Sequence, residues 1–270
     1  MRTAGRRSRI IGQHAASALL PITVFLAAVA LWELLVRWLD IPPYVLPAPS
    51  LVMRTLVADW PTLSQSLWVT LRITSSALFL AVAGGVALAI LFAQWRWVER
   101  SFFPFAVILQ VTPIVAIAPL LLIYLDQTTA VLVCAFLVAF FPILSNTALG
   151  LASAEHNLLD LFKLYGASRW QELVLLRLPS ALPFFLGGLR IGGGLALIGA
   201  IVAEIAAGSA GQGAGLAFRI VESGYRLNIP RMFAALLLIS VTGILIYLLL
   251  AGLARLLLGR WHDSARSRES

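Results

Sequence analysis

Six long runs of apolar residues divide the chain, and polar residues collect in the segments between them. The runs cover residues 17–39, 68–94, 103–125, 129–150, 184–207 and 233–258. Each run is too long for a buried strand, whereas about 20 apolar residues let one helix cross a bilayer. The pattern therefore predicts an all-α, polytopic membrane protein with about six transmembrane helices. Prolines at positions 104, 113, 119 and 142 predict breaks or kinks in the third and fourth runs.

The composition supports this class. Apolar residues make up 60% of the 270 residues, charged residues only 12%, and the mean hydropathy is +0.93. Because soluble domains carry about 25% charged residues, this chain has too little charge to cover a water-facing surface. Cys134 is the only cysteine, and the three histidines are far apart, without a partner at metal-ligand spacing. We therefore expect no enzyme activity, no metal site and no bound cofactor.

The basic residues give the chain a formal net charge of +8, which by itself would be compatible with nucleic-acid binding. However, they collect in the tails and the short loops between apolar runs, and most lie on the side of the N-terminus. This placement is typical of a protein that orients itself in a lipid bilayer. We expect a multi-pass membrane protein with both termini in the cytoplasm, and no nucleic-acid partner.

This topology predicts the order of segments along the chain. An Ala28-Val29-Ala30 sequence in the first run resembles a signal-peptide cleavage site, but the apolar run continues past it, which favours an uncleaved span. Ser50 is expected to cap a short interfacial helix in the first outer loop. The expected segments are a basic cytoplasmic N-terminal tail (1–16), a first transmembrane helix (17–39), a periplasmic loop with an interfacial helix (40–67), a core of five transmembrane helices (68–258) and a cytoplasmic tail (259–270).

The inner loop at 151–183 is long and patterned. Its first part places Leu158, Leu161, Phe162 and Tyr165 on one helical face, and Gly166 then permits a sharp break. A second amphipathic stretch continues to a Leu-Pro pair at 178–179. Because an apolar helix face outside the membrane needs a cover, and because this segment has few basic residues for lying on lipid, a partner protein is favoured.

The same loop resembles the cytoplasmic signature of ABC importer permeases, E-A-A-x3-G-x9-I-x-L-P. The spacing matches throughout, with Asp160 in place of Glu, Leu161 and Phe162 in place of the two alanines, and Leu176 in place of Ile. Further segments are similar to permeases of the nitrate, sulfonate, taurine and pyrimidine-precursor group. These are Leu46-Pro47-Ala48-Pro49-Ser50, Gln110-Val111-Thr112-Pro113, and Gly187-Gly188-Leu189-Arg190 followed by Val202-Ala203-Glu204.

The resemblance implies a type I ABC importer permease fold, a location in the bacterial inner (plasma) membrane and a set of partners. A second permease chain, expected to be a second copy, would complete the path, and a periplasmic solute-binding protein would deliver the solute. A cytoplasmic ABC ATPase dimer would bind ATP, since the one lysine, Lys163, lacks the Gly-Lys-Ser/Thr context of a P-loop. The loop residues that the resemblance assigns to ATPase coupling are Asp160, Leu161, Phe162, Tyr165, Gly166, Ala167, Arg169, Leu178 and Pro179.

Four polar residues inside the apolar runs are candidates for lining the path: Gln110, Thr112, Asn146 and Glu204. Glu204 has no basic residue within four positions, so its ionised form would need water or a partner. It also lies near the outer end of its run, where a structural role at the interface is the alternative. The other three side chains are of types that often bond to a neighbouring helix. A Gly188-x-x-x-Gly192 pattern predicts close helix approach, either within the chain or across a dimer.

A secondary active transporter is the alternative class. Such a protein would show internal repeats with matched broken helices and paired carboxylates near mid-membrane. No repeat is evident, and Glu204 has no second carboxylate in its run, so the importer permease is favoured. Phe103-Pro104-Phe105 and the residues up to Pro113 are most similar to permeases for pyrimidine precursors of the hydroxymethylpyrimidine or riboflavin type. Sulfonate, taurine and nitrate are the alternative solutes.

Overall fold

The computed structural model describes residues 4–208 and 213–259, with side chains from Leu20 onward. Every regular element in these ranges is a helix, so the predicted all-α class is confirmed. The elements are α1 (Ala4–Trp38), α2 (Pro49–Ala58), α3 (Trp60–Gln94), α4 (Arg96–Val111), α5 (Ile114–Tyr124), α6 (Gln127–Ala152), α7 (His156–Leu164), α8 (Arg169–Glu172), the π-helix η1 (Leu173–Arg177), α9 (Leu178–Ala207), α10 (Leu216–Tyr225) and α11 (Ile229–Leu258).

Five helical segments are long and apolar enough to cross a membrane, and a bent pair makes the sixth. The five are Leu20–Trp38, Trp60–Gln94, Gln127–Ala152, Arg169–Ala207 and Ile229–Leu258. The predicted number of about six spans is therefore confirmed. The basic residues expected in the two tails lie outside the residues whose side chains are described.

The third apolar run, 103–125, is interrupted, as its prolines predicted. It is divided between α4 and α5, which meet at an angle of 99°. Thr112 and Pro113 both have extended backbone there, and Pro113 has no N–H with which to continue the helix. Pro104, Pro119 and Pro142 lie inside helices, so only Pro113 coincides with a break.

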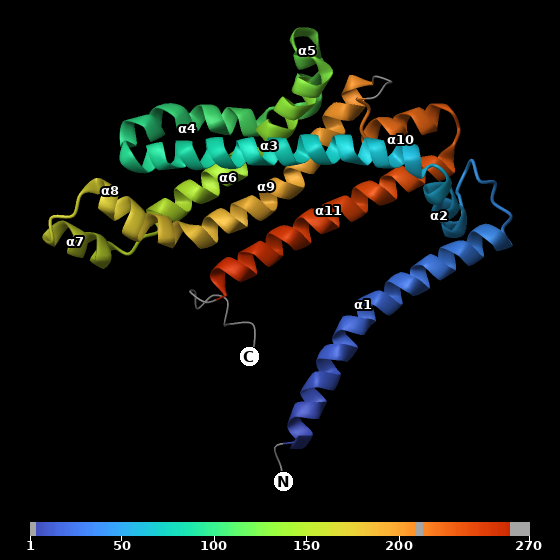
Figure 1. Ribbon diagram of the computed structural model, residues 1–270, viewed down its shortest axis with the longest axis horizontal. Coiled ribbons are helices and arrows are strands. Elements are labelled where there is room, and N and C mark those ends of the chain that lie inside the picture. Colours follow the sequence, from blue (N-terminus) through green and yellow to red (C-terminus); the bar gives the residue numbers. More distant parts are fainter. Residues whose placement is uncertain (1–3, 209–212, 260–270) are drawn as a thin grey trace.

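The core of the bundle is formed by α3, α6 and α9, with α11 beside α9 (Figure 1). Glycines of α9 allow its close approach to α6. A Cβ at Gly188 would lie 2.8 Å from Asn146 Cβ, and one at Gly192 would lie 2.9 Å from Ile143 Cδ1. The Gly-x-x-x-Gly pattern therefore serves packing within the chain, which decides between the two alternatives left by the sequence.

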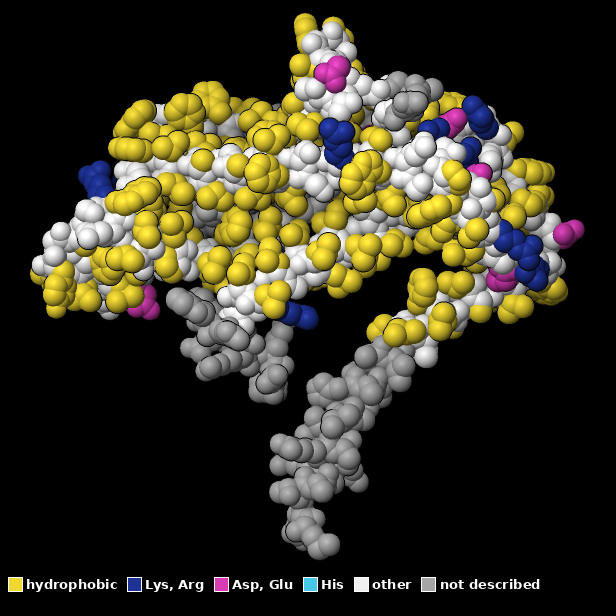
Figure 2. Space-filling view, viewed as in Figure 1, with side chains coloured by type: hydrophobic (Ala, Val, Ile, Leu, Met, Phe, Trp, Pro, Cys, Tyr) yellow, Lys and Arg dark blue, Asp and Glu magenta, His cyan; other side chains and the backbone are white. Residues whose placement is uncertain are grey.

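Two elements leave the bundle. Helix α5 projects from it beside the C-terminal end of α9, and α1 diverges from α11 over most of its length (Figure 1). Near its C-terminal end α1 contacts the bundle through Trp32 and Phe233, whose ring centroids are 5.8 Å apart. Hydrophobic side chains cover much of the visible surface, and the charged side chains collect mainly towards the two ends of the bundle (Figure 2). This distribution suits helices that span a bilayer along the long axis.

Candidate functional site

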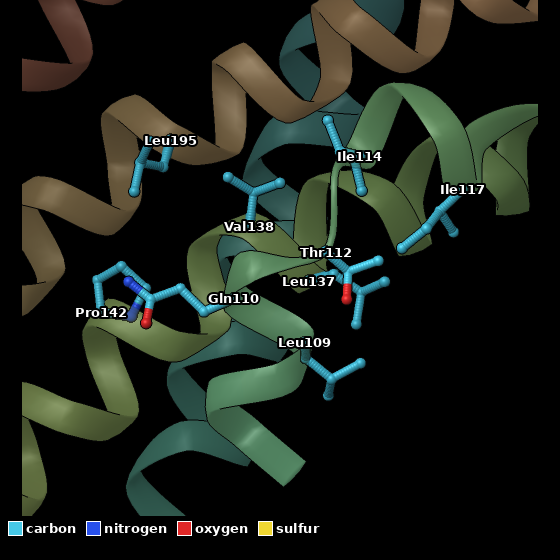
Figure 3. Close-up of a pocket in the computed structure, with 9 residues that line it drawn as sticks. All are labelled: Leu109, Gln110, Thr112, Ile114, Ile117, Leu137, Val138, Pro142 and Leu195. Atoms are coloured by element: carbon cyan, nitrogen blue, oxygen red, sulfur yellow. The ribbon is translucent and has the colours of Figure 1, made fainter. Parts of the chain in front are cut away.

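A cavity of about 240 Å³ lies at the bend between α4 and α5. Its walls come from both bent helices, from α6 and from one residue of α9 (Figure 3). No lining residue is charged, and the polar side chains among them are those of Gln110 and Thr112. The lining residues are Leu109, Gln110, Thr112, Ile114, Ile117, Leu137, Val138, Pro142 and Leu195.

The two polar side chains of the cavity have different surroundings. The Gln110 side chain is exposed and extends towards Pro142 of α6 (Figure 3). An amide in this position offers both a hydrogen-bond donor and an acceptor. The Ile108 carbonyl accepts from the Thr112 hydroxyl at 2.6 Å and from the Thr112 N–H at 3.1 Å. The hydroxyl oxygen of Thr112 still has acceptor capacity.

Asn146 lies one turn beyond Pro142 on α6 but does not line this cavity. Its Nδ2 donates to the Pro142 carbonyl at 2.8 Å. The side chain is half-buried where Gly188 of α9 approaches α6. The structure thus separates Asn146 from Gln110 and Thr112, and places it in the helix contact.

Glu204 is also separate from the cavity. Its side chain is 2% exposed and accepts hydrogen bonds from Thr70 Oγ1 at 2.8 Å and from the Ala217 N–H at 3.0 Å. Thr70 Oγ1 in turn accepts from the Leu216 N–H at 2.9 Å. Glu204 and Thr70 therefore satisfy the first backbone donors of α10, whose N-cap residue has no side chain to do so. These contacts favour the structural alternative for Glu204.

A second carboxylate acts in the same way on α2. Glu33 and Arg37 lie four positions apart on α1 and form a pair, with Arg37 Nε donating to Glu33 Oε1 at 2.7 Å. In addition, Glu33 accepts from the Ser50 N–H at 2.9 Å and from the Ser50 hydroxyl at 2.7 Å. The N-cap of α2 is Ala48 rather than the predicted Ser50. The expectation was wrong because Pro49 begins the helix, and Glu33 supplies the acceptor that Ala48 lacks.

The inner loop forms two short helices, α7 and α8, at one end of the bundle (Figure 1). Gly166 has a φ of +66°, and a Cβ there would meet nothing within 4 Å. Glycine is therefore suited to this position by its backbone conformation rather than by a lack of space. The N–H groups of Gly166 and Ala167 donate to the carbonyls of Lys163 and Phe162, at 3.0 and 2.9 Å, and close the end of α7.

The second helix of the loop begins with a capping box that the sequence analysis missed. The Ser168 hydroxyl accepts from the Gln171 N–H at 3.3 Å, and the Gln171 side chain accepts from the Ser168 N–H at 2.8 Å. A Ser-x-x-Gln spacing is readable from sequence and would have located this helix start. Glu172 then pairs with Arg177 across η1, with Arg177 Nε donating at 2.7 Å. This pair braces the junction between the loop and α9.

The loop divides into an exposed part and an anchored part. Four large side chains of the exposed part are Leu161 (44% exposed), Leu164 (85%), Tyr165 (83%) and Trp170 (66%). Phe162 is half-buried, Arg169 is exposed, and Asp160 pairs with Lys163 at 2.9 Å near the surface. The anchored part packs beside α6 in the same cluster as Leu144 and Leu151 and includes Leu173 and Leu178. Pro179 lies in the first turn of α9.

Helix α10 carries a cluster of paired charges near its C-terminal end. On α10, Glu222 accepts from Arg219 at 2.8 Å and pairs with Arg226 at 3.1 Å. The hydrogen bond from Arg219, together with the positive charges of Arg219 and Arg226, lowers the pKa of Glu222 below its ordinary value.

Across the described residues, no group of three or more His, Cys, Asp or Glu side chains is arranged to hold a metal ion.

Comparisons with known proteins place these features in context. A family model described as "Binding-protein-dependent transport system inner membrane component" matches residues 81–262. The chain is 36% identical to a riboflavin transport system permease protein of Chloroflexus aurantiacus, over 91% of this chain and 90% of that protein. It is 35% identical to a formylaminopyrimidine transport permease protein of Halalkalibacterium halodurans, over 89% and 95% of the two chains.

A solved structure has a similar fold. It is described as a crystal structure of an amino acid ABC transporter with histidines, and the TM-score is 0.60 at 18% identity. The similarity covers 74% of this chain and 95% of that chain. At this level of identity the comparison concerns the fold, including the arrangement of the membrane helices.

Proposed function

Since the chain belongs to the family of binding-protein-dependent transport system inner membrane components, we propose that two copies of it form the solute path of an ATP-driven importer. The chain is the membrane-spanning permease of an ABC importer, as the sequence analysis predicted. Membership of this family excludes the alternative class, a secondary active transporter. The two termini face the cytoplasm in this proposal, because the basic residues collect on that side.

The observation that carries the proposal is the exposed apolar surface of the α7–α8 loop. Leu161, Leu164, Tyr165 and Trp170 project from the end of the bundle without a cover from the rest of the described chain. Burying such side chains in a groove of another protein is favourable and gives a helix-in-groove contact. We assign this surface to the cytoplasmic ABC ATPase dimer, which binds the ATP, and assign no cofactor to the permease itself.

The loop is built to transmit a movement of that partner. Its exposed residues are joined through η1 to α9, and the anchored residues Leu173 and Leu178 pack beside α6. A push on α7 and α8 therefore reaches the two helices that form the centre of the bundle. Helix α9 carries Leu195 at the wall of the cavity, so the ATPase contact and the proposed path share this helix.

We place the solute path along the cavity at the α4–α5 bend, with Gln110 and Thr112 as its polar contacts. A stripe on one face of α9 consists of the exposed residues Gly187, Ile191 and Ile198 and the half-buried Gly194, and a second copy would complete the wall there. Asn146 and Glu204 hold the helices that frame the path. The periplasmic solute-binding protein would deliver its solute at the opposite end, beside α2 and α10.

The proposed solute is a small pyrimidine precursor or flavin-type ring. The names of the riboflavin and formylaminopyrimidine relatives support it, as does a cavity without charged side chains. A neutral ring that donates and accepts hydrogen bonds suits the amide of Gln110. Sulfonate, taurine and nitrate are the competing solutes, and each of them carries an anionic group that this wall does not balance.

A matched pair of substitutions tests the ATPase contact. Tyr165 ends α7 with 83% of its side chain exposed, and Tyr225 ends α10 on the opposite side with 87% exposed. We expect Tyr165→Glu to reduce copurification of the ATPase by about tenfold, because a charge would enter the buried groove. Tyr225→Glu should retain the ATPase, and equal retention by both variants would remove the support for this docking surface.

A further inference from the structure

One π-helical turn, η1, joins the α7–α8 loop to α9. Its five residues run from Leu173 to Arg177, and the N–H of Leu178 donates to the carbonyl of Leu173, five positions earlier. The elements on either side, α8 and α9, are α-helical. Single π turns are rare and often occur at functional sites. Any movement that passes from the loop to α9 along the chain must cross this turn, so its conformation affects how the two are coupled.

Pro179, two positions after η1 in the first turn of α9, gives a local reason for the π turn. Proline has no N–H, and in an α-helix its ring would collide with the carbonyl four positions earlier, which here is that of Leu175 inside η1. The carbonyl of Leu176 accepts from the Ser180 hydroxyl at 2.9 Å, a type of contact that bends helices. Both features weaken the α-helical hydrogen-bond pattern at this point, and the π turn accommodates them.

The ion pair across η1 fits the π-helical form and not the α-helical one. Arg177 Nε donates to Glu172 Oε1 at 2.7 Å, and the two side chains are 27% and 17% exposed. In an α-helix, residues five positions apart are separated by about 140° around the axis, so these two side chains would point to different faces. In a π-helix the hydrogen-bonded residues are five positions apart, which places both side chains on one side. Winding η1 into an α-helix would therefore pull the pair apart.

The segments on the two sides of η1 are restrained differently. On one side, α9 packs closely on α6, since a Cβ at Gly150 would lie 2.8 Å from Ala181 Cα. Leu173, at the start of η1, is 1% exposed and packs in the cluster beside α6. On the other side, the pair between Asp160 and Lys163 lies within α7, so it does not connect α7 to α9. A change in the winding of η1 would therefore turn α7 and α8 relative to α9 rather than move α9.

We propose that Glu172 and Arg177 are positioning residues that hold η1 in its π-helical form. The proposal rests on the function proposed above, in which α7 and α8 contact the ATPase dimer. While the pair is intact, the exposed surface of α7 and α8 has one orientation relative to α9, and a displacement of the ATPase reaches α9. When the pair is broken, η1 can wind towards an α-helix and absorb that displacement. The two residues thus act on transport through the orientation of the loop.

The distance between two spin labels tests this role in the full-length permease, alone and with its ATPase bound. In a Cys134→Ala background, Lys163→Cys labels an exposed position of α7, and Leu149→Cys labels α6, where 59% of the side chain is exposed. Labelled chains are diluted with unlabelled ones, so that each measured distance lies within one chain. We expect one distance in the chain with the pair intact, with and without ATP. Glu172→Gln should add a second distance, because the amide loses the ion pair and η1 can rewind.

Two further comparisons provide a rescue and a control. Exchanging the two charges, with Glu172→Arg and Arg177→Glu together, should restore the single distance, which a general loss of stability would not do. Pro179→Ala should add a second distance because it removes the local reason for the π turn. Pro183→Ala is the matched control, since Pro183 lies inside α9 beyond η1, and it should keep the single distance. Each variant should still copurify with the ATPase, because the exposed surface of α7 and α8 is unchanged.

Other outcomes contradict the proposal. An unchanged distance in Glu172→Gln overturns it, as does a second distance that the charge exchange fails to remove. Equal second distances in Pro179→Ala and Pro183→Ala also count against it. Should Glu172→Gln fail to fold, Arg177→Gln takes its place with the same expectations. If the unsubstituted permease does not retain the ATPase, the proposed function fails, whereas the distances in the permease alone still decide whether the pair holds η1.

Discussion

At the scale of single residues, two carboxylates cap helices that do not cap themselves. Glu33 serves α2 and Glu204 serves α10, while the N-cap residues of these helices, Ala48 and Gly215, provide no side-chain acceptor. The N-terminus of a helix presents unpaired N–H groups and a partial positive charge. A carboxylate there needs no arginine or lysine partner. This explains how Glu204 is accommodated in a buried position without a cation.

This arrangement makes a prediction for Glu204→Gln. The amide places an N–H₂ against either Thr70 or Ala217, one of which then loses its acceptor. We expect a loss of about 1–3 kcal/mol of stability and a lower melting temperature of the purified permease. Thr70→Val should also lower it, whereas Gln110→Leu, at the cavity wall, should lower uptake without lowering the melting temperature. If Glu204→Gln leaves the melting temperature unchanged and abolishes uptake, Glu204 lines the solute path instead of capping α10.

The role of Glu204, the most prominent polar residue inside an apolar run, was hard to predict from the sequence. Glu204 has no basic neighbour in sequence, and that isolation is equally expected for a water-lined path and for a helix cap. The deciding partners are Thr70, 134 positions away, and backbone N–H groups of α10. The residue types in a sequence do not show which backbone N–H groups lie near a side chain in the fold. By contrast, the Glu33–Arg37 pair can be read from the sequence, because an i, i+4 spacing is local.

The stability of the permease at acidic pH should depend on Glu222, which lies on α10 outside the spans. The pKa of its carboxyl is lowered by the hydrogen bond from Arg219 and by the nearby arginines. A group whose pKa is lower in the folded state stabilises the fold above its unfolded pKa, and this contribution is lost as the pH falls through the folded value. We therefore expect the melting temperature to fall below about pH 4.5, and Glu222→Gln to show a smaller fall in that window.

At the scale of elements, the bend between α4 and α5 positions the cavity. The break requires an extended Thr112–Pro113 pair, and α5 then packs through Ala118 on a cluster that includes Ala203 of α9. The sequence predicted an interruption from proline. The angle of 99° was not predictable, because it depends on the packing of α5 against α6 and α9 rather than on the local sequence.

Replacing Pro113 tests this element. Pro113→Ala restores an N–H and removes the ring, so α4 and α5 can approach one continuous helix. We expect loss of uptake with normal membrane insertion, and loss of a disulfide between Ala118→Cys and Ala203→Cys in a Cys134→Ala background. Pro104→Ala is the matched control, since Pro104 lies inside α4 without a break. Retention of the cross-link in Pro113→Ala would show that packing alone maintains the bend.

The α7–α8 loop gives a graded prediction at Gly166. Its φ of +66° costs about 1–2 kcal/mol for a residue with a Cβ, and Asn tolerates it better than β-branched residues. Because a Cβ there meets nothing within 4 Å, only the backbone preference should matter. We expect ATPase copurification to fall in the order Gly166, Gly166→Asn, Gly166→Ala, Gly166→Val. An equal effect of Asn and Val would point to a lost contact of glycine with the partner instead.

At the scale of the whole molecule, the described chain leaves several apolar faces uncovered. These are the stripe on α9, the projecting α5, much of α1 and the exposed side chains of the α7–α8 loop. Lipid covers apolar side chains within the bilayer, but it does not cover α7 and α8 if they lie in the cytoplasm. The number of spans and the loop were predictable, since they depend on composition and local periodicity. The arrangement of α1 and α5 depends on contacts that the sequence does not encode locally.

The orientation of the molecule underlies the assignment of each surface to a partner, and labelling can determine it. In a Cys134→Ala background, His156→Cys places an exposed thiol at the start of α7, and Tyr225→Cys places one at the end of α10. Because the basic residues collect on the side of α7, we expect a membrane-impermeant maleimide to label position 225 in intact cells and position 156 only after the membrane is opened. Both positions are exposed, so a difference in labelling reports sidedness rather than burial. Labelling of position 156 in intact cells would invert the topology and move the α7–α8 surface away from the ATPase.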